Sequence, residues 1–333
     1  MIVLSVLGWA VVTIVLAGAA VGATTLVARA CPNVVVAVAQ LLLPWWTVGA
    51  AAVVAWSASA GRWWLVVVAA AVALLGAAVV GSRLRPRRRA ASGSAGSAGR
   101  PTVSVVLANL YLDNPEPDEA IGQLLERRPD VLVMTELTDE LVARFDRLGG
   151  ATDYAHRIHP EPIEGEYVPG IFARRPLLDA DVVDRAELRT VEASVQLDGE
   201  HVRVMVAHPE APSTLDGFRM WRRQLRRLQA TLRDSAGPMV ALGDLNSGTL
   251  QAPYEDLLRT RFRDAHADAG RSLVPSWGIA PWMPRWVPTF VARLDHLLVS
   301  PELEVVELED LEAVGSDHRP FCATVALAAR TGR

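Results

Sequence analysis

Three long stretches without a charged residue open the sequence, and they constrain the fold more than any other feature of the chain. They cover residues 2–27, 34–55 and 63–80. Each is long enough to cross the roughly 30 Å hydrocarbon layer of a bilayer as a helix that rises about 1.5 Å per residue. A helix at the surface of a soluble core would show a polar stripe at helical spacing, and none of the three does. We therefore expect three transmembrane helices within a membrane anchor at residues 1–82.

The placement of the arginines predicts the orientation of this anchor. All eight charged residues before Pro101 are arginines, and five of them gather at Arg83, Arg85, Arg87, Arg88 and Arg89. Positive charges near the ends of membrane spans stay in the cytoplasm. The cluster thus predicts a multi-pass protein of the cell membrane whose C-terminal part lies in the cytoplasm. Residues 83–101 continue into a Ser/Gly/Ala-rich stretch, which we expect to form a flexible, basic linker. The lipid bilayer is the first expected partner, and no obligate protein partner is evident.

The charge balance and the residue pattern both change after the linker. Without the eight arginines, 25 of the 33 basic residues stand against all 37 acidic ones, a net charge of −12. Short apolar runs that end in polar residues alternate with amphipathic helical segments. This mixture predicts an α+β domain over residues 102–333. The two cysteines, Cys31 and Cys322, exclude a disulfide framework and a cysteine-based zinc site. No glycine-rich phosphate loop occurs, which argues against P-loop and dinucleotide-binding folds.

Polar residues stand where the predicted strands begin or end. They are Asn109, Glu136, His208, Asp244, Asn246, Asp295, Asp317 and His318. Polar groups at the same end of neighbouring strands converge, so we expect a cluster of carboxylates, amides and imidazoles. Magnesium takes one or two carboxylates and leaves positions open for phosphate oxygens. The expected cofactor is therefore Mg²⁺ or Mn²⁺, with Glu136 as the first ligand. Taken singly, each residue also has an ordinary interpretation as a solvated strand end or a turn.

Six segments in one order link these residues to a known family. The segments are LANLYLDN, RPDVLVMTEL, VAHPEAP, ALGDLNSG, RLDHLLVS and GSDHRPFCATV. Together they resemble the endonuclease/exonuclease/phosphatase superfamily, and the resemblance covers residues 102–328. It implies a four-layered αββα sandwich, here preceded by three transmembrane α-helices, with the site at one end of two packed sheets. It also implies a divalent-metal-dependent phosphoester hydrolase, either a phosphodiesterase or a phosphatase.

The resemblance implies catalytic roles that the local chemistry supports. His318 would be the base that activates water, because an imidazole titrates near neutral pH. Asp295 would hydrogen-bond His318 and fix its tautomer. Asp244 would polarise the nucleophile or the leaving group, and Asn246 would donate to a phosphoryl oxygen. His208 would contact the phosphate or the leaving oxygen.

The metal ligands implied by the resemblance are Glu136 with Asn109 and Asp317 in direct or indirect contact. Two positions depart from the family pattern. Tyr111 stands where some nucleases of the family carry an acidic residue, which argues against a second metal contact there. Ala173 stands where a serine is expected, which removes a hydroxyl donor.

The substrate stays open at this point. The main hypothesis is a hydrolase of a phosphodiester or phosphomonoester at the membrane, with a lipid headgroup or a nucleic acid as substrate. A membrane-tethered nuclease is its enzymatic rival, although a net charge of −12 disfavours the binding of free nucleic acid. The third hypothesis is a non-catalytic membrane scaffold that retains the fold.

Three further features have open interpretations. Arginines decorate the outer face of the helix expected at residues 216–233, and they indicate a solvated face, a nucleic-acid site or an anionic-lipid site. The residues are Arg219, Arg222, Arg223, Arg226, Arg227 and Arg233. A Pro-rich segment with Trp277, Trp282 and Trp286 predicts an aromatic loop beside the site. His296 alternates with Asp295 along a strand, so we expect it to point away from the site.

Overall fold

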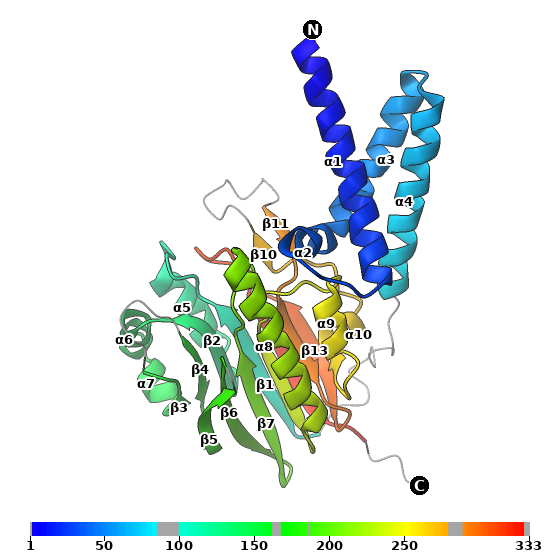
Figure 1. Cartoon of the computed structure of the whole chain (residues 1–333). Helices are drawn as coiled ribbons and strands as arrows, with labels where there is room; N and C mark the ends of the chain where they lie inside the picture. The colour runs from blue at the N-terminus through cyan, green and yellow to red at the C-terminus, as the bar shows by residue number, and fades with distance from the viewer. Residues whose placement is uncertain (1, 85–99, 162–167, 186, 279–288, 330–333) are drawn as a thin grey trace.

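The computed structural model describes residues 2–84, 100–161, 168–185, 187–278 and 289–329. In these ranges a bundle of apolar helices rises from one end of a two-sheet domain (Figure 1). Most of the expected linker, residues 85–99, lies outside the described residues, as do Trp282 and Trp286 of the aromatic segment.

The anchor contains four helices, of which one lies across the end of the domain. Helices α1 (Ile2–Val27), α3 (Leu43–Ser59) and α4 (Trp63–Arg83) stand side by side, and the short α2 (Val34–Leu41) lies at their base (Figure 1). α1 and α4 are long and apolar enough to cross a membrane. α2 and α3 reach that length only as a pair, with a bend of 70° between them.

The bend corrects one expectation. The sequence predicts one continuous helix over residues 34–55, but the structure breaks it at Leu42, which stands between α2 and α3. Pro44 occupies the first turn of α3. Proline has no backbone N–H and its ring clashes with the preceding turn, so the helix cannot run straight through this position. The predicted membrane spans rest on length and composition, for α1 and α4 as for the bent pair, and stay a prediction.

Two six-stranded sheets form the core of the domain, with the orders β13-β14-β1-β2-β4-β3 and β5-β6-β7-β8-β12-β9. The strands of the first sheet are β1 (Thr102–Asn109), β2 (Val131–Leu137), β3 (His156–Ile158), β4 (Val168–Ala173), β13 (Leu303–Asp310) and β14 (Phe321–Leu327). Those of the second are β5 (Leu178–Arg185), β6 (Leu188–Leu197), β7 (Glu200–Ala207), β8 (Met239–Asp244), β9 (Arg263–Asp264) and β12 (Asp295–Val299). A small ribbon pairs β10 (Trp277–Gly278) with β11 (Phe290–Ala292). Among the described strands, β1–β2 and β7–β8 are the parallel pairs.

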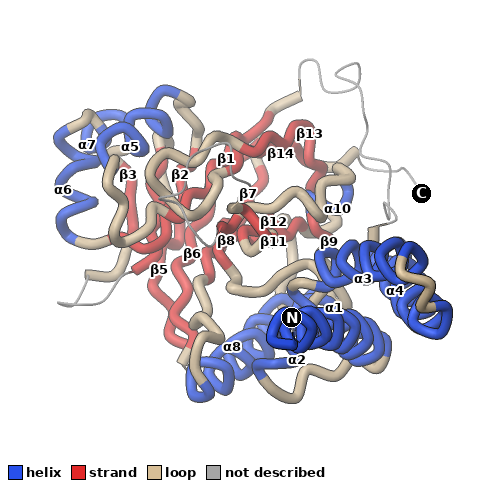
Figure 2. The backbone as a smooth tube through the Cα atoms, turned by 90° about the horizontal axis from the view of Figure 1, so that it is seen from above, coloured by secondary structure: helices blue, strands red, loops and turns tan. Residues whose placement is uncertain are grey.

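Helices cover the outer face of each sheet, which gives four layers. On one side lie α5 (Pro117–Glu126), α6 (Asp139–Arg147) and α7 (Gly150–Asp153); on the other lie α8 (Leu215–Asp234) and α9 (Ala252–Leu257). The short α10 (Ala265–Asp268) contacts β9 and β12 of the second sheet and β13 of the first. Figure 2 shows α5–α7 and α8 on opposite sides of the strands. The inner faces of the sheets share one buried apolar cluster that includes Leu107, Val204 and Leu297. The chain therefore has the αββα sandwich that the sequence predicts.

The lower end of the anchor packs directly on the domain. Leu26 and Leu43 of the anchor belong to the same buried apolar cluster as Trp221 of α8 and Tyr254 of α9. Because this cluster crosses the boundary, burial of apolar surface joins the two parts in addition to the chain connection.

Buried hydrogen bonds specify how the two parts meet. Gln251 Nε2 donates to the carbonyl of Ala37 at 2.8 Å, and the amide of Ala252 donates to Gln40 Oε1 at 3.1 Å. Gln40 and Gln251 are buried, and buried polar groups need such partners. An ion pair of Arg83 with Glu255 and a hydrogen bond from Trp45 Nε1 to the Val291 carbonyl at 2.9 Å complete the junction.

Candidate active site

Polar residues from both sheets meet at one end of the sandwich. In the first sheet, Asn109 ends β1 and Glu136 lies near the end of the parallel neighbour β2. In the second sheet, His208 follows β7 and Asp244 ends the parallel neighbour β8. Parallel neighbours bring their carboxyl ends to the same edge of a sheet. Asp295, at the start of β12, is paired with Asp244 across the antiparallel strands β12 and β8, and it adds a further carboxylate to this edge.

Glycine allows β7 and β8 to lie close together at this edge. Gly243 has a φ of +152°, and a Cβ there would approach the Ala207 carbonyl oxygen to 1.9 Å. Any other residue would have to push the two strands apart. The glycine therefore helps to hold His208 and Asp244, the next residues of the two strands, beside each other.

Asn109 connects the carboxylates of the two sheets. Its Nδ2 donates to Glu136 Oε1 at 2.8 Å and to Asp244 Oδ2 at 3.1 Å. The amide of Leu112 donates to the other oxygen of Glu136 at 2.9 Å. Both oxygens of Glu136 are thus held in place by described donors, and the carboxylate is fixed in orientation before any ligand arrives.

Three non-glycine residues around this cluster have a left-handed backbone. They are Tyr111 with φ +60°, Glu136 with φ +58° and Asn246 with φ +48°. Such a conformation costs of order 1 kcal/mol or more for a residue with a side chain, and it persists where surrounding contacts enforce it. At Tyr111 the contact is a hydrogen bond from its amide to Asn109 Oδ1 at 3.0 Å. Backbone strain therefore coincides with the predicted site.

Asn246 turns its side chain toward the loop after β7. Its amide N–H donates to Asp244 Oδ1 at 2.8 Å, and its Nδ2 donates to the Pro209 carbonyl at 2.9 Å. The side-chain amide has two hydrogens, so this bond leaves the second one for another acceptor. Its predicted role as a donor to a phosphoryl oxygen stays a prediction.

His318 and Asp295 form the pair that the sequence predicts. His318 Nδ1 lies 2.7 Å from Asp295 Oδ2, and both side chains are buried. His318 Nε2 faces Asp244 Oδ2 at 3.4 Å. Because Asp295 accepts the proton of Nδ1, a neutral ring presents an unprotonated Nε2 to the centre of the cluster.

Charge around His318 sets its protonation. Burial alone lowers the pKa of the imidazole, but the carboxylates of Asp295 and Asp244 outweigh burial and raise it to about 10. Burial opposes the ionisation of Asp244 as well, yet His318 and His208 hold the pKa of Asp244 well below its ordinary value. A divalent cation beside these carboxylates would offset their charge and bring the imidazole pKa down toward the range of a base.

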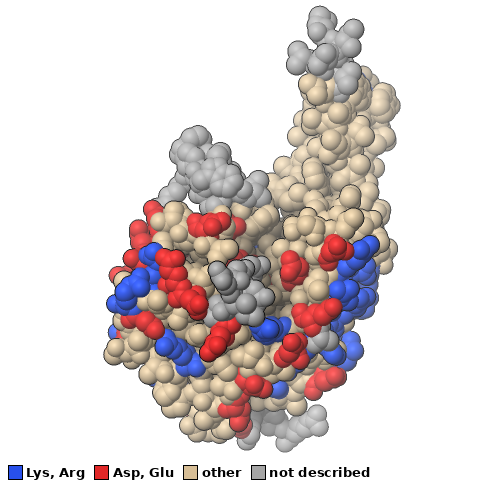
Figure 3. Space-filling view, turned by 60° about the vertical axis from the view of Figure 1, so that its left-hand side comes forward, with Lys and Arg blue, Asp and Glu red and all other residues tan. Residues whose placement is uncertain are grey.

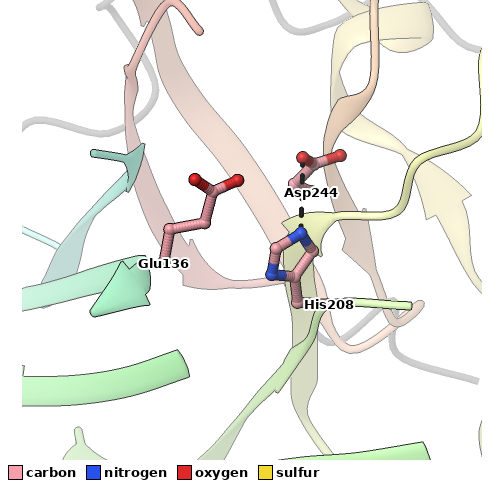
Figure 4. Close-up of side chains that lie close together, drawn as sticks. All are labelled: Glu136, His208 and Asp244. Atoms are coloured by element: carbon pink, nitrogen blue, oxygen red, sulfur yellow. Dashed lines mark ion pairs between the residues drawn. The ribbon is translucent and has the colours of Figure 1, made fainter. Parts of the chain in front are cut away.

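Glu136, His208 and Asp244 form a group that fits a metal ion. Their ligand atoms lie within 4.8 Å of one another, and Figure 4 shows the three side chains directed toward a common space. His208 Nε2 lies 3.6 Å from Asp244 Oδ2. The ligand atoms of a second group, Asp244, Asp295 and His318, also lie within 4.8 Å of one another. The carboxylates of Glu136 and Asp244 are donors suited to Mg²⁺ or Mn²⁺. Asn109 turns its NH₂ group, not its oxygen, toward these carboxylates, so its predicted contact with the metal stays a prediction.

Asp317 lies at the edge of the cluster. Trp277 Nε1 donates to its Oδ2 at 3.2 Å, whereas its Oδ1 is buried without a hydrogen-bond partner among the described residues. Burial raises the pKa of Asp317 to about 6; His318 opposes this shift, and Glu136 and Asp244 add to it. Neither of the two candidate groups found in the described part of the chain includes Asp317. Its contact with a metal stays a prediction.

Ser276 helps to position Asp295, a role that the sequence did not predict. It is fully buried, and its Oγ accepts hydrogen bonds from the amides of Leu294 at 3.0 Å and Asp295 at 3.1 Å. It therefore fixes the start of β12, where Asp295 begins. A serine beside a tryptophan in a Pro-rich segment carries no signal of this role. Trp277 in the same segment does reach the site, as its bond to Asp317 shows.

Two other expectations can be compared with the structure. His296 points away from the site: it is fully buried, its Nε2 lies 2.8 Å from the Ser247 carbonyl, and its ring packs 4.1 Å from that of Tyr254. Ala173 is paired with Val131 at the start of β2, the end opposite Glu136. A serine at Ala173 would therefore donate to nothing in this cluster.

Comparisons with known proteins identify the family and the fold. Residues 106–318 match the model of the Endonuclease/Exonuclease/phosphatase family. A search of curated proteins returned no match.

Three solved structures share the fold over 67% to 69% of this chain. A humanized TDP2 of D. rerio is 16% identical with a TM-score of 0.55, and the match covers 67% of this chain and 98% of that one. An endonuclease/exonuclease/phosphatase from Beutenbergia cavernae is 18% identical with a TM-score of 0.55, over 69% and 72% of the two chains. D. rerio TDP2 complexed with a single-strand DNA product is 17% identical with a TM-score of 0.54, over 67% and 98%.

Proposed function

The chain belongs to the endonuclease/exonuclease/phosphatase family, a phosphoester hydrolase fold, and we propose that it is a membrane-tethered, divalent-metal-dependent phosphodiesterase or phosphatase. One observation carries the proposal. Asp244 Oδ2 lies within 3.6 Å of both His208 Nε2 and His318 Nε2, so the candidate metal group and the His318–Asp295 pair share one carboxylate. A phosphate bound at the first group would lie next to the imidazole of the second.

The donors at the centre suit a hard cation. Glu136 and Asp244 would hold Mg²⁺ or Mn²⁺, with Asn109 hydrogen-bonded to both carboxylates and Asp317 at the edge. Bound there, the cation would supply positive charge that offsets the charge of the phosphate.

The remaining residues would act on water and phosphate. His318 Nε2 would take a proton from the attacking water, and Asp295 would hold the tautomer that makes this possible. Asn246 and His208 would donate to phosphoryl oxygens as negative charge builds on them. Asp244 would also polarise the nucleophile or the leaving group.

Exposed apolar side chains on the anchor support a location in the membrane. Val67 is 70% exposed and Leu74 is 71% exposed, both on α4, and Leu7, Val11 and Ile14 are exposed along α1. Large contiguous apolar surfaces of this kind avoid water. A multi-pass anchor in the cell membrane accounts for them, and the arginines that begin at Arg83 favour the cytoplasmic side for the domain.

A membrane-tethered nuclease is the alternative. It is favoured by the D. rerio TDP2 relative that contains a single-strand DNA product. Against it stands the net charge of −12 of residues 101–333, which repels a phosphate backbone. On the face shown in Figure 3, acidic and basic side chains are interspersed over the domain, while the upper part of the helices shows neither.

The test is a substrate panel offered to the full chain in lipid nanodiscs. Phospholipids, phosphoinositide headgroups, DNA and RNA are each supplied with Mg²⁺ or Mn²⁺, and EDTA serves as the control. We expect metal-dependent release of phosphate or of a phosphorylated headgroup. Hydrolysis of nucleic acid alone would favour the nuclease. Metal binding without hydrolysis of any substrate would favour a non-catalytic scaffold.

Protease added to intact cells tests the orientation separately. A cytoplasmic domain is protected until the cells are opened.

A further inference from the structure

A cavity lined by arginines lies where the anchor meets α8, apart from the candidate active site. Its volume is about 370 Å³. The lining residues are Pro32, Asn33, Leu215, Phe218, Arg219, Arg222, Arg223 and Arg226. We call this the arginine pocket. It has no acidic lining residue among those described, and none of its residues belongs to the active site. The guanidinium group matches the geometry of phosphate oxygens, so the lining selects an anionic, phosphate-bearing ligand.

Two of the four arginines already have carboxylate partners. Arg219 pairs with Asp216 at 2.9 Å, and Arg223 pairs with Glu187 at 2.7 Å. These two charges are largely offset by their neighbours.

Arg222 and Arg226 are different. The described part of the chain contains no ion pair for either of them, and the guanidinium of Arg222 lies 5.8 Å from the ring of Phe218. They are four residues apart on one helix, so they lie on the same face of α8. The pocket therefore presents two positive charges that no carboxylate in the described chain offsets.

The pocket lies at the base of the apolar bundle. Its other wall is the connection from α1 to α2, and Figure 1 shows the first turns of α8 beside α2, at the end of the domain from which α1, α3 and α4 rise. The base of a membrane anchor is the level of lipid headgroups.

Exposed apolar side chains lie on the pocket wall and on the two helices, α1 and α2, that its other wall connects. Leu215, which lines it, is 65% exposed, and Val35 on α2 is 70% exposed. Val27 at the end of α1 and Val38 on α2 are exposed as well. Exposed apolar side chains next to the pocket would not strengthen the binding of a soluble phosphate compound. A site for a lipid needs them, because the acyl chains next to the headgroup contact apolar side chains.

We propose that the arginine pocket binds the phosphate of an anionic phospholipid headgroup, with Arg222 and Arg226 as the principal contacts. The bound lipid would hold the α8 side of the domain against the bilayer, opposite the α5–α7 side. The proposal relies on the membrane location given above and is independent of the hydrolytic chemistry.

The experiment measures lipid binding rather than turnover. The full chain is purified in detergent, and short-chain phosphatidylglycerol and short-chain phosphatidylcholine are titrated into it by calorimetry. The test variant is Arg222→Gln with Arg226→Gln. The control variant is Arg233→Gln with Arg259→Gln, which removes two exposed arginines outside the pocket.

We expect the wild type and the control to prefer phosphatidylglycerol to phosphatidylcholine. The test variant should bind phosphatidylglycerol roughly 30-fold more weakly, given ~1 kcal/mol for each arginine near an anionic surface. Equal affinities in all three proteins would overturn the proposal. So would glycerophosphate or a single-stranded oligonucleotide that binds the pocket as tightly as the lipid.

Two checks keep the result interpretable. Matching thermal midpoints for the test and control variants establish that folding is intact. Resistance of the wild type to extraction from membranes by alkaline carbonate tests the membrane location on its own. A chain that is extracted contradicts the tether, and a chain that stays but ignores phosphatidylglycerol contradicts only the pocket.

Discussion

His318 Nε2 lies 3.4 Å from Asp244 Oδ2, while His318 Nδ1 lies 2.7 Å from Asp295 Oδ2. One imidazole is thus held between two carboxylates that belong to paired strands, β8 and β12. β12 carries Asp295, which orients the imidazole, and its neighbour β8 carries Asp244, a candidate metal ligand. A displacement of either strand would therefore alter both the candidate metal group and the His318–Asp295 pair. The first two predictions concern this arrangement.

Replacing His318 with Ala should lower kcat by about 10²- to 10⁴-fold, the contribution that positioned acid–base groups typically make. Turnover with the substrate identified by the panel measures the loss, and the thermal midpoint checks the fold. Unchanged turnover would exclude His318 as the base. Replacing His156 with Ala is the matched control, because that histidine is exposed on β3.

Replacing Asp295 with Asn keeps the size of the side chain and removes its charge. Asp295 raises the pKa of His318, so the variant should titrate His318 at a lower pH than the wild type. NMR of the metal-free protein with labelled histidine measures this shift. Turnover should fall as well, because the amide no longer fixes the productive tautomer. A His318 that titrates at the same pH in both proteins would contradict the assignment.

Replacing Glu136 with Gln should weaken Mn²⁺ binding by roughly tenfold or more, since one of the few carboxylates of the cluster loses its charge. Calorimetry on the full chain measures the affinity. The same change at Glu307, which is exposed on β13, should leave it unaltered. If both variants bind Mn²⁺ like the wild type, the metal group is wrongly assigned.

Acid should destabilise the fold through His296. Burial lowers the pKa of His296 to about 4, against the attraction of Asp264, whereas the unfolded chain binds a proton near its ordinary value of 6.5. Above pH 6.5 both states are neutral and stability is unaffected. As the pH falls from 6.5 to 4, the unfolded state gains protons first, so folding loses up to about 3 kcal/mol. Thermal midpoints across this range measure the loss.

Replacing His296 with Gln retains a donor for the Ser247 carbonyl and removes the titration. Its midpoint should fall less between pH 6.5 and 4 than that of the wild type. A parallel decline in the two proteins would assign the acid sensitivity to other groups.

Replacing Gln251 with Ala should destabilise the protein by about 1–3 kcal/mol, because the buried carbonyl of Ala37 and the amide of Gly248 both lose their side-chain partner. The midpoint of thermal unfolding in detergent measures the effect. Replacing the exposed Gln196 with Ala is the control and should change it by less than about 0.5 kcal/mol. Equal midpoints would mean that the junction contributes little.

The resemblance of six ordered segments to a known family predicted the sandwich. The candidate site residues could be proposed from the sequence because a strand end is a local feature. Asn109, Glu136, Asp244 and His318 each close or flank an apolar run, and the order of six segments supplied the topology. Which of these side chains would face one another depends on how two sheets pack. For this reason the sequence did not indicate that His208 would lie with Glu136 and Asp244, as it does in the structure, and the metal contact of Asp317 stays a prediction.

The anchor was predicted less completely. An apolar stretch predicts the length of a helix but not which residues it contacts. Only one feature of the sequence indicated that α2 packs on the domain. That feature is Gln40, a polar residue within an otherwise apolar stretch, whose Oε1 accepts the amide of Ala252. Pro44 likewise marked the break at Leu42, but a proline does not specify the angle, and the bend of 70° could not be predicted from the sequence.

The apolar cluster that Leu26 and Leu43 share with Trp221 and Tyr254 has a consequence for how this chain can be divided. A change of composition places a boundary near residue 101, but the hydrophobic core has no boundary there. A fragment cut at that point would expose apolar side chains to water and would aggregate or need a detergent. The hydrolase is therefore not an interchangeable module, and a foreign membrane anchor would serve it only if it reproduced the surface that α2 presents.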